Sequence, residues 1–404
     1  MNLLVSSKAI SPEELGAAEL TDLLGSTTIA FLKEGEGLLG WGEATRLSAT
    51  GKDRITKLAS AWMNLVAEAE VTDEVKLSGS GLTGFGSITF SEDSQEMSVL
   101  IIPQVIIGKT KSSFFITTIN TTLEEAKALI KEQPEAKHLE FQPGNISTEN
   151  FENNVVRAKA LIADGELAKV VLARDLAATA NNFNPNPGLL KLANRYPSCY
   201  TYLVDGMFGA SPELLLSVEN KSVSARVLAG TAGRGTDVEV DKAIGEALAN
   251  SHKNLDEHKY AIDSLTAAMS ELCIEIEASS MPFSLALPNL WHLASDVSAK
   301  LKDNATSLQL LEAMHPSAAV AGTPRDKALE VIKDLEEIDR GRYAGPVGWV
   351  SANGDGVWAI ALRGAQQTGN TIRAFAGCGI VAESDPASEL AETNLKFKAV
   401  LENL

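Results

Sequence analysis

The spacing of hydrophobic residues in the N-terminal half indicates one helix and several strands. Between residues 52 and 70 the apolar side chains recur every three or four positions, which predicts an amphipathic helix. These side chains are Ile55, Leu58, Trp62, Leu65 and Val66. Apolar runs at residues 98–102 and 113–119 favour strands. The polar stretch 140–150 and the Asn/Pro-rich stretch 181–188 are typical of loops or linkers.

The segment after these loops mixes strand-like and helix-like patterns. Residues 168–177 form an apolar run that includes Lys169 and predicts a buried strand. Residues 212–230 predict two strands joined by a polar turn. Residues 241–273 carry apolar side chains at helical spacing, as one long helix or two shorter helices would.

The C-terminal part completes the predicted fold. Residues 343–377 predict three strands with turns at 353–356 and 369–370, and such short turns force antiparallel pairing. A last helix is expected from Pro386, with Asp385 as its N-cap. The sequence therefore predicts an α/β fold of the α+β type with largely antiparallel sheets, while its length alone permits one large domain or several smaller ones.

Charge and cysteine content narrow the setting in which the protein acts. A formal net charge of −18 repels nucleic-acid backbones and anionic membrane surfaces, so we expect neither as a partner. A multiply charged anionic substrate would need local cations or a metal ion where it binds. Three widely spaced cysteines without a CxxC motif, and the lack of a secretory leader pattern, favour a reducing cytoplasm.

Glutamates on two predicted helices form the first candidate site. Glu389, Glu392 and Lys396 fall on one face of the last helix. From spacing alone, a solvated ion pair between Glu392 and Lys396 is the simpler interpretation. However, Glu257 lies on another predicted helix, beside Lys253, and two helices that each present a glutamate can hold a hard cation through oxygen ligands.

Charged residues beside apolar runs are candidates for proton transfer. Lys169 is either a catalytic base or a strand-end lysine that reaches solvent. Glu213 starts a predicted strand, where apolar surroundings would raise its pKa towards that of a general acid; otherwise it is an edge-strand carboxylate with no task. His292 and His315 could bind a metal, but they are better explained as satisfied core histidines.

Nine sequence blocks, taken together, resemble the chorismate-utilising enzymes, which include isochorismate, anthranilate, aminodeoxychorismate and salicylate synthases. In chain order the blocks are KVVLARD, GASPELLL, LAGTAGRG, SHKNLDEHKYAID, LWHLAS, HPSAAVAGTPRDKA, DRGRYAGPVGW, WAIALRGA and AGCGIVAESDPASELAETNLK. The resemblance implies one large domain over residues 1–404, with antiparallel β-sheets flanked by helices. Residues 1–150 would be its divergent N-terminal part, and residues 155–404 its motif-bearing catalytic part.

The resemblance also implies a set of site residues and a small-molecule partner, chorismate. Glutamates at the positions of Glu257 and Glu392 would hold Mg²⁺, with Glu389 close by. Arg363 and Tyr343 match residues that bind the enolpyruvyl carboxylate of chorismate. The other implied substrate-binding positions are Gly230, Thr231, His292, Ala319, Gly377, Gly379 and Lys396. Family members of this kind are often monomers, and we expect a monomer here.

The residue at position 169 separates activities within the family. Members that add water to the ring carry lysine there, whereas members that add ammonia lack it. The resemblance thus implies Lys169 as the base and Glu213 as the acid that protonates the departing ring hydroxyl. The expected activity is the reversible conversion of chorismate to isochorismate.

Two other functions are weighed against this one. Salicylate synthases keep the lysine, but they tend to carry threonine where this chain has Ala319. A non-catalytic Mg²⁺-dependent binder of an anionic metabolite would be expected to lack Lys169 or Glu213. The sequence leaves menaquinone, siderophore and salicylate pathways open, with YAGPVGW leaning towards the menaquinone type.

Overall fold

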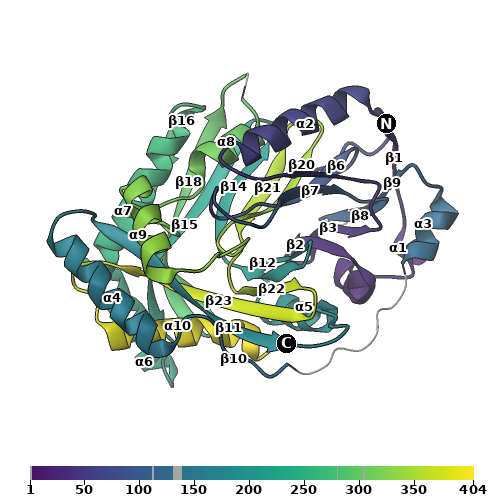
Figure 1. The fold of residues 1–404 in the computed structure, drawn as a ribbon. Helices are drawn as coiled ribbons and strands as arrows, with labels where there is room; N and C mark the ends of the chain where they lie inside the picture. Colours follow the sequence, from purple (N-terminus) through teal and green to yellow (C-terminus); the bar gives the residue numbers. More distant parts are fainter. Residues whose placement is uncertain (1, 112, 131–138, 280, 304) are drawn as a thin grey trace.

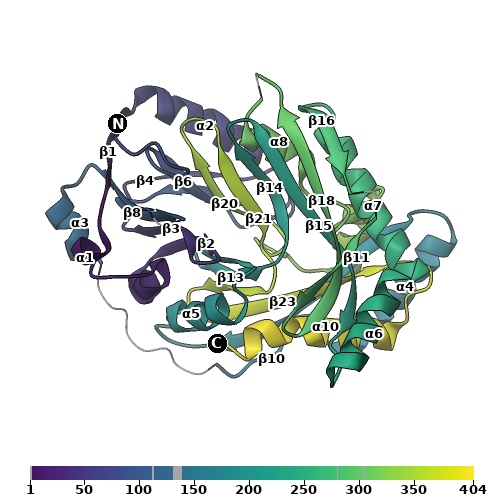
Figure 2. The ribbon, with the colours of Figure 1, turned by 180° about the vertical axis from the view of Figure 1, so that it is seen from behind.

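Two large sheets form the centre of the computed structural model, which describes residues 2–111, 113–130, 139–279, 281–303 and 305–404. Among these residues, every strand pairing is antiparallel except that of β1 with β5. The chain folds as a single α+β domain (Figures 1 and 2), so the predicted fold class is confirmed.

The first sheet contains strands from both halves of the chain. Its order is β10 (Gln142–Pro143), β11 (Lys169–Thr179), β23 (Thr371–Ile380), β22 (Gly364–Thr368), β13 (Met207–Ser211), β12 (Tyr200–Val204), β2 (Ile29–Lys33), β3 (Glu36–Trp41), β8 (Val105–Thr110), β9 (Ser113–Ile119), β1 (Leu4–Ala9) and β5 (Glu70–Asp73), with β19 (Gly322–Thr323) paired to β11.

The second sheet also contains strands from both halves of the chain. Its order is β16 (Cys273–Ala278), β18 (Leu290–Leu301), β15 (Ser222–Gly233), β14 (Leu214–Glu219), β21 (Gly356–Ile360), β20 (Pro346–Ser351), β6 (Thr83–Ser87), β7 (Ser98–Ile102) and β4 (Thr45–Ala49), with β17 (Phe283–Leu287) paired to β18. Because β2 pairs with β12 and β6 with β20, the N-terminal residues complete both sheets.

Helices cover the outer faces of the sheets. They are α1 (Pro12–Leu15), the 3₁₀ turn η1 (Leu20–Ser26), α2 (Arg54–Glu68), α3 (Leu123–Leu129), α4 (Thr148–Ala163), α5 (Asn186–Arg195), α6 (Val238–Ala249), α7 (His252–Met269), α8 (Ser307–Met314), α9 (Arg325–Glu336) and α10 (Pro386–Leu401). In Figure 1, α2 and α8 lie over the second sheet, and α4, α6, α7, α9 and α10 gather at the left. Within the described part of the chain, every helix is too short or too polar to cross a bilayer.

The hydrophobic core is layered between and outside the sheets. A cluster that contains Ile29 and Phe31 of the first sheet with Val347 and Trp349 of the second lies between them. A second cluster packs strands of both sheets against α2, α4, α7, α8 and α9, and a third packs mainly strands of the first sheet against η1, α5 and α10. Apolar side chains that alternate along the strands fill these layers, which fixes the register of both sheets.

Several predicted elements need correction at their boundaries. The stretch 140–150 is not a continuous loop, because it contains β10 and the start of α4, which Ser147 caps. The stretch 181–188 likewise includes the first turn of α5. Residues 241–273 fall in two helices, α6 and α7, and reach the first residue of β16.

The segment 343–377 was wrongly predicted as three strands, since it contains β20, β21, β22 and most of β23. The sequence WAIALRGA looks like one strand, but β21 ends at Ile360 in the second sheet and β22 begins at Gly364 in the first. Arg363 stands at this crossover with a left-handed φ of 51°. The helix from Pro386, capped by Asp385, and the helix within 52–70 are confirmed.

Candidate active site

A cavity of about 60 Å³ opens where the chain crosses between the sheets. Glu213 lies at one crossover, between β13 and β14, and Arg363 at the other, between β21 and β22. The predicted residues that line the cavity are Glu213, Gly230, Thr231, Glu257, His292, Ala319, Tyr343, Arg363, Gly377, Gly379 and Lys396. Two larger hollows, of about 610 and 570 Å³, contain none of the predicted site residues.

Glu213 is a buried carboxyl group that holds its proton near neutrality. Only 5% of its surface is exposed, and burial raises its pKa to about 8 against the opposing charges of Lys169, Arg363 and Lys396. Because β14 lies between β15 and β21, the alternative of an edge-strand carboxylate is wrong. A carboxyl group protonated at pH 7 can donate a proton, as a general acid must.

Lys169 is the first residue of β11, and its side chain is fully buried. The alternative of a lysine that reaches solvent is therefore wrong. Its ammonium nitrogen has no hydrogen-bond partner among the described residues, and it lies 3.3 Å from Oε1 of Glu257. A buried amine with spare hydrogen-bonding capacity beside the cavity is equipped to exchange a proton with a bound molecule.

Each glutamate of the predicted metal site is paired with a lysine. Besides the Lys169–Glu257 pair, Nζ of Lys253 lies 2.7 Å from Oε1 of Glu389. Nζ of Lys396 lies 2.7 Å from Oε1 of Glu392. The helical pair of Glu392 and Lys396 thus exists, but it is not simply solvated, because the Lys396 side chain is only 13% exposed and its ammonium also donates to the Gly377 carbonyl.

Lys253 shows that the three carboxylates share one region. Burial lowers its pKa, yet the negative charges of Glu389, Glu257 and Glu392 outweigh this effect and raise the pKa overall. Glu389 is itself only 2% exposed, and burial, together with the charge of Glu392, raises its pKa. The three carboxylates therefore lie close together between α7 and α10, and nearby lysines balance their negative charge.

This donor set fits Mg²⁺ in chemistry. In the described part of the chain no three His, Cys, Asp or Glu side chains converge as a ready metal cluster. Mg²⁺, however, usually takes one or two protein carboxylates and fills its other positions with water and substrate oxygens. Glu257 and Glu392, with lysine ammonium groups as stand-in cations, match that requirement.

Arg363 and His292 form the polar end of the cavity. An Nη of Arg363 donates to Nε2 of His292 over 2.7 Å, and the histidine Nδ1 lies 3.2 Å from the Gly230 carbonyl oxygen and from the Thr231 hydroxyl. Burial and the arginine charge hold the pKa of His292 well below its usual range, so the ring is neutral. His292 is thus a satisfied buried histidine, and one that also faces the cavity.

His315 belongs to the hydrophobic core. Its Nε2 lies 3.3 Å from the Phe90 carbonyl oxygen, and burial lowers the pKa of His315 to about 3. It is absent from the cavity wall. A metal-binding role for His315 therefore has no support.

Gly379 lets strand β23 approach the Lys169–Glu257 pair. A Cβ at this position would lie 2.2 Å from Oε1 of Glu257 and 2.9 Å from Cε of Lys169. Any side chain would displace both charged groups. The glycine thus leaves room for the ion pair in its observed position beside β23.

Several residues of the cavity wall were not predicted from the sequence, and three of them carry a charged, aromatic or thiol side chain. Arg340, Phe375 and Cys378 line the cavity, and the Phe375 ring stacks on that of Tyr343 with centroids 4.9 Å apart. Arg340 and Cys378 lie inside blocks that carry the family resemblance, which is the signal that could have identified them.

These groups are those of an enzyme for acid–base chemistry on a small anion, because the protonated Glu213 and the cations Arg363 and Lys396 face one cavity. The buried Lys169 amine is not itself on the wall, but it lies 3.3 Å from the lining residue Glu257. Comparisons with known proteins agree. A model of the chorismate binding enzyme family matches residues 29–404, and the chain therefore belongs to that family.

Individual relatives refine the comparison. The chain is 37% identical over 266 residues to isochorismate synthase DhbC of Bacillus subtilis (strain 168), covering 63% of this chain and 67% of that protein. It is 38% identical over 269 residues to a putative isochorismate synthase MenF of Mycobacterium tuberculosis (strain H37Rv), covering 62% and 72%. The crystal structure of a putative isochorismate synthase DhbC from Bacillus anthracis superimposes with a TM-score of 0.77 at 28% identity, covering 95% of this chain and 99% of that one.

Proposed function

We propose that this protein is an isochorismate synthase that converts chorismate to isochorismate reversibly and with Mg²⁺. The observation that carries the proposal is a protonated Glu213 on the cavity wall with the buried Lys169 amine beside that wall, 3.3 Å from the lining residue Glu257. The relatives named as isochorismate synthases support it.

Lys169 and Glu213 divide the proton transfers between them. Lys169 must carry a neutral amine in the reactive form, and this amine accepts a proton from the water whose oxygen bonds to C2 of the ring. Glu213 donates its proton to the C4 hydroxyl, which leaves as water while the double bonds shift. No net proton is gained or lost, so after turnover the lysine must return its proton and the glutamate regain one. The raised pKa of Glu213 supplies a donor at neutral pH.

Binding of the dianionic substrate requires the strong negative field of the protein to be reversed locally. Arg363 and Tyr343 line the cavity and would bind the enolpyruvyl carboxylate, for which a guanidinium fork is well suited. Glu257 and Glu392 would hold Mg²⁺, with Glu389 beside them. When bound, the ion would neutralise the ring carboxylate. Lys396 and the backbone around Gly377 and Gly379 would complete the anion site.

A salicylate synthase is the second candidate, because it would need the same Lys169 and Glu213. Ala319 on the cavity wall favours the first activity, since the alternative enzymes tend to carry a hydroxyl-bearing threonine there. Release of pyruvate without an added lyase would indicate the second activity. An ammonia-adding synthase is disfavoured by Lys169 itself.

Incubation of the purified protein with chorismate and Mg²⁺, followed by chromatography, tests the proposal directly. We expect isochorismate to appear, and to disappear when Lys169→Ala or Glu213→Gln replaces the wild type. Glu219→Gln is the matched control and should retain activity, because Glu219 is an exposed carboxylate at the far end of β14, the strand that follows Glu213. Full turnover by either site variant would refute the assigned roles, and an inactive wild type would refute the function.

The cellular setting is part of the same proposal. Three free, buried cysteines suit a reducing cytoplasm, where we place the protein. We also propose a monomer; light scattering at micromolar concentration that gave twice the chain mass would contradict it.

A further inference from the structure

Glu336 and Arg340 form an ion pair inside the protein, with Arg340 on the cavity wall and Glu336 behind it. Glu336 is the last residue of α9, and Arg340 follows after the chain leaves the helix. Their side chains are only 1% and 2% exposed. Arg340 Nε donates to Oε2 of Glu336 over 2.8 Å, and an Nη donates to Oε1, so the contact is bidentate.

The pair ties together three separate segments. Glu336 Oε1 accepts the backbone N–H of Ala173 over 2.7 Å. Arg340 donates to the carbonyl oxygen of Val171 over 2.8 Å and to that of Val320 over 3.2 Å. One guanidinium therefore spans strand β11 and the segment that precedes β19.

Each of these segments carries a cavity residue. Val171 is two positions from Lys169 on the same face of β11, and Val320 follows Ala319. The backbone N–H of Tyr343 donates to the Arg340 carbonyl over 3.0 Å. The ion pair thus connects the walls that present Lys169, Ala319 and Tyr343.

Stability alone does not account for this arrangement. A buried ion pair is often no more stabilising than apolar residues of the same volume, although removal of one partner is strongly destabilising. What the guanidinium adds is direction, because its donors are fixed in one plane and reach carbonyls on two segments at once.

We propose that the Glu336–Arg340 pair is a positioning unit that holds Lys169 in place against the Ala319 and Tyr343 walls. It rests on the proposed function, because Lys169 is the base of that reaction. Neither residue needs to touch the reacting atoms. A displacement of a catalytic group by about 1 Å can reduce turnover on the order of 100-fold, so loss of the pair should reduce kcat more than it raises KM.

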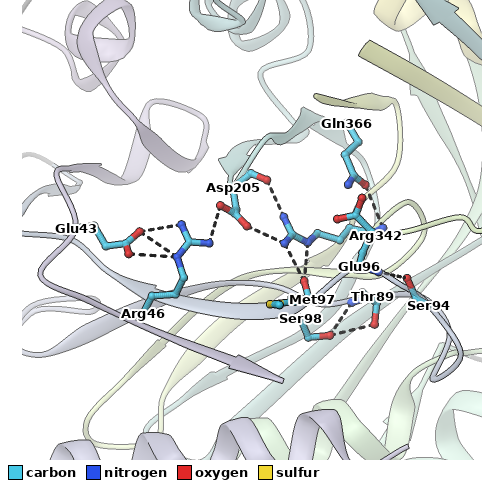
Figure 3. A network of polar contacts seen from close by, with 10 residues as sticks. All are labelled: Glu43, Arg46, Thr89, Ser94, Glu96, Met97, Ser98, Asp205, Arg342 and Gln366. Carbon is cyan, nitrogen blue, oxygen red and sulfur yellow. Dashed lines mark hydrogen bonds and ion pairs between the residues drawn. The ribbon is translucent and has the colours of Figure 1, made fainter. Parts of the chain in front are cut away.

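Arg342 offers a matched control two residues further along the chain. As a whole residue Arg342 is 4% exposed, against 3% for the whole of Arg340, and it also binds backbone carbonyls and a carboxylate. Figure 3 shows its guanidinium directed at Asp205 and the Met97 carbonyl, in a network that continues to Arg46 and Glu43. Its side chain faces the 610 Å³ hollow and is not part of the catalytic cavity wall.

The test compares Arg340→Lys with Arg342→Lys. Both changes keep the charge and remove the fork, so both should reduce thermal stability to a similar extent. We expect kcat for chorismate to fall at least 10-fold in Arg340→Lys, with KM changed less than threefold, and both values to stay within threefold of wild type in Arg342→Lys. Equal kcat values in the two variants would overturn the proposal.

A double variant separates positioning from stability. Glu336→Leu with Arg340→Met replaces the pair by apolar side chains and should recover most of the thermal stability that Arg340→Met alone loses. We expect its kcat to stay low. Recovery of wild-type kcat would mean that the pair is only a packing element.

Hydrogen exchange gives a readout that does not depend on the reaction. Backbone amides of residues 169–173 and 319–321 should exchange faster in Arg340→Lys than in Arg342→Lys under native conditions. Unchanged exchange in these segments would refute the positioning role, whether or not the wild-type protein acts on chorismate. If the wild-type protein is inactive on chorismate but exchange is faster in Arg340→Lys, the proposed function is rejected and the positioning role stands.

Discussion

Glu213→Gln is the change that tests the electrostatics of the site most directly. Glutamine has the shape of a protonated glutamate but cannot ionise, so it removes one titration and little else. In the folded protein the pKa of Glu213 is raised from 4.5 to about 8, chiefly by burial. The folded state therefore binds a proton that the unfolded chain has already released between these two pH values.

The sign and size of the effect follow from that difference. Stability contributed by a group with a raised pKa is fully present below pH 4.5 and is lost as pH rises through about 8. Between pH 6 and 8 the loss is about 1.4 kcal/mol per pH unit, or roughly 2–3 kcal/mol in all. Relative to wild type, Glu213→Gln should thus become more stable by this amount as the pH increases.

Urea unfolding at pH 6, 7, 8 and 9 measures the difference. Other groups titrate in both proteins, so the subtraction isolates Glu213. Glu219→Gln, at the end of the strand that follows Glu213, is the control and should follow wild type at every pH, because its carboxylate is exposed. A wild-type-minus-variant difference that did not change with pH would show that Glu213 is ionised in the folded protein.

The titration of Glu213 also predicts a fall in kcat/KM on the alkaline side of the pH profile. The value of kcat/KM reports ionisations of the free enzyme, and a general acid works only while protonated. We expect kcat/KM to fall as pH rises above about 8, approaching tenfold per unit. A profile that stayed flat to pH 9.5 would contradict the assignment of Glu213 as the acid.

Three further changes test the rest of the site. Lys169→Met should reduce kcat on the order of 100-fold or more without loss of the fold. Activity assays and thermal unfolding measure the two effects, and a variant with nearly wild-type kcat would contradict the role of Lys169. Glu392→Gln should weaken Mg²⁺ binding, measured by calorimetry, by about 10-fold or more, and unchanged affinity would remove it from the metal site. Arg363→Lys keeps the charge but loses the fork, so KM for chorismate should rise on the order of 10-fold, whereas a normal KM would place the carboxylate elsewhere.

Much of the fold could be predicted because its periodic signals are local. The helix α2 has an apolar stripe, and α10 has both a cap and a proline at its start. By contrast, the crossover between β21 and β22 has no local signal, since Ala361 and Leu362 continue the apolar run. The chain leaves one sheet for the other there because of tertiary packing, which overrides local pattern.

The site shows the same division. Spacing could place Glu389, Glu392 and Lys396 on one helical face, but it could not show that Lys253 from α7 completes the charge balance. The burial of Lys169 could not be predicted from the sequence pattern either, because an apolar run does not reveal which end of a strand is covered. The Glu336–Arg340 pair was missed since acidic and basic residues four apart are common on exposed helices.

The position of the cavity follows from where a sheet sandwich can present charge. Along a strand, side chains alternate between a packed layer and the opposite face, so a charged group directed at the centre would have to enter an apolar layer. Glu213 and Arg363 avoid this because each stands in a crossover, where the backbone turns out of both sheets. Arg363 adopts a left-handed φ of 51°, which costs a non-glycine residue on the order of 1 kcal/mol or more. The strained residue is the one whose guanidinium is buried against His292. The backbone strain therefore holds a cation at the cavity, where an anionic substrate would need it.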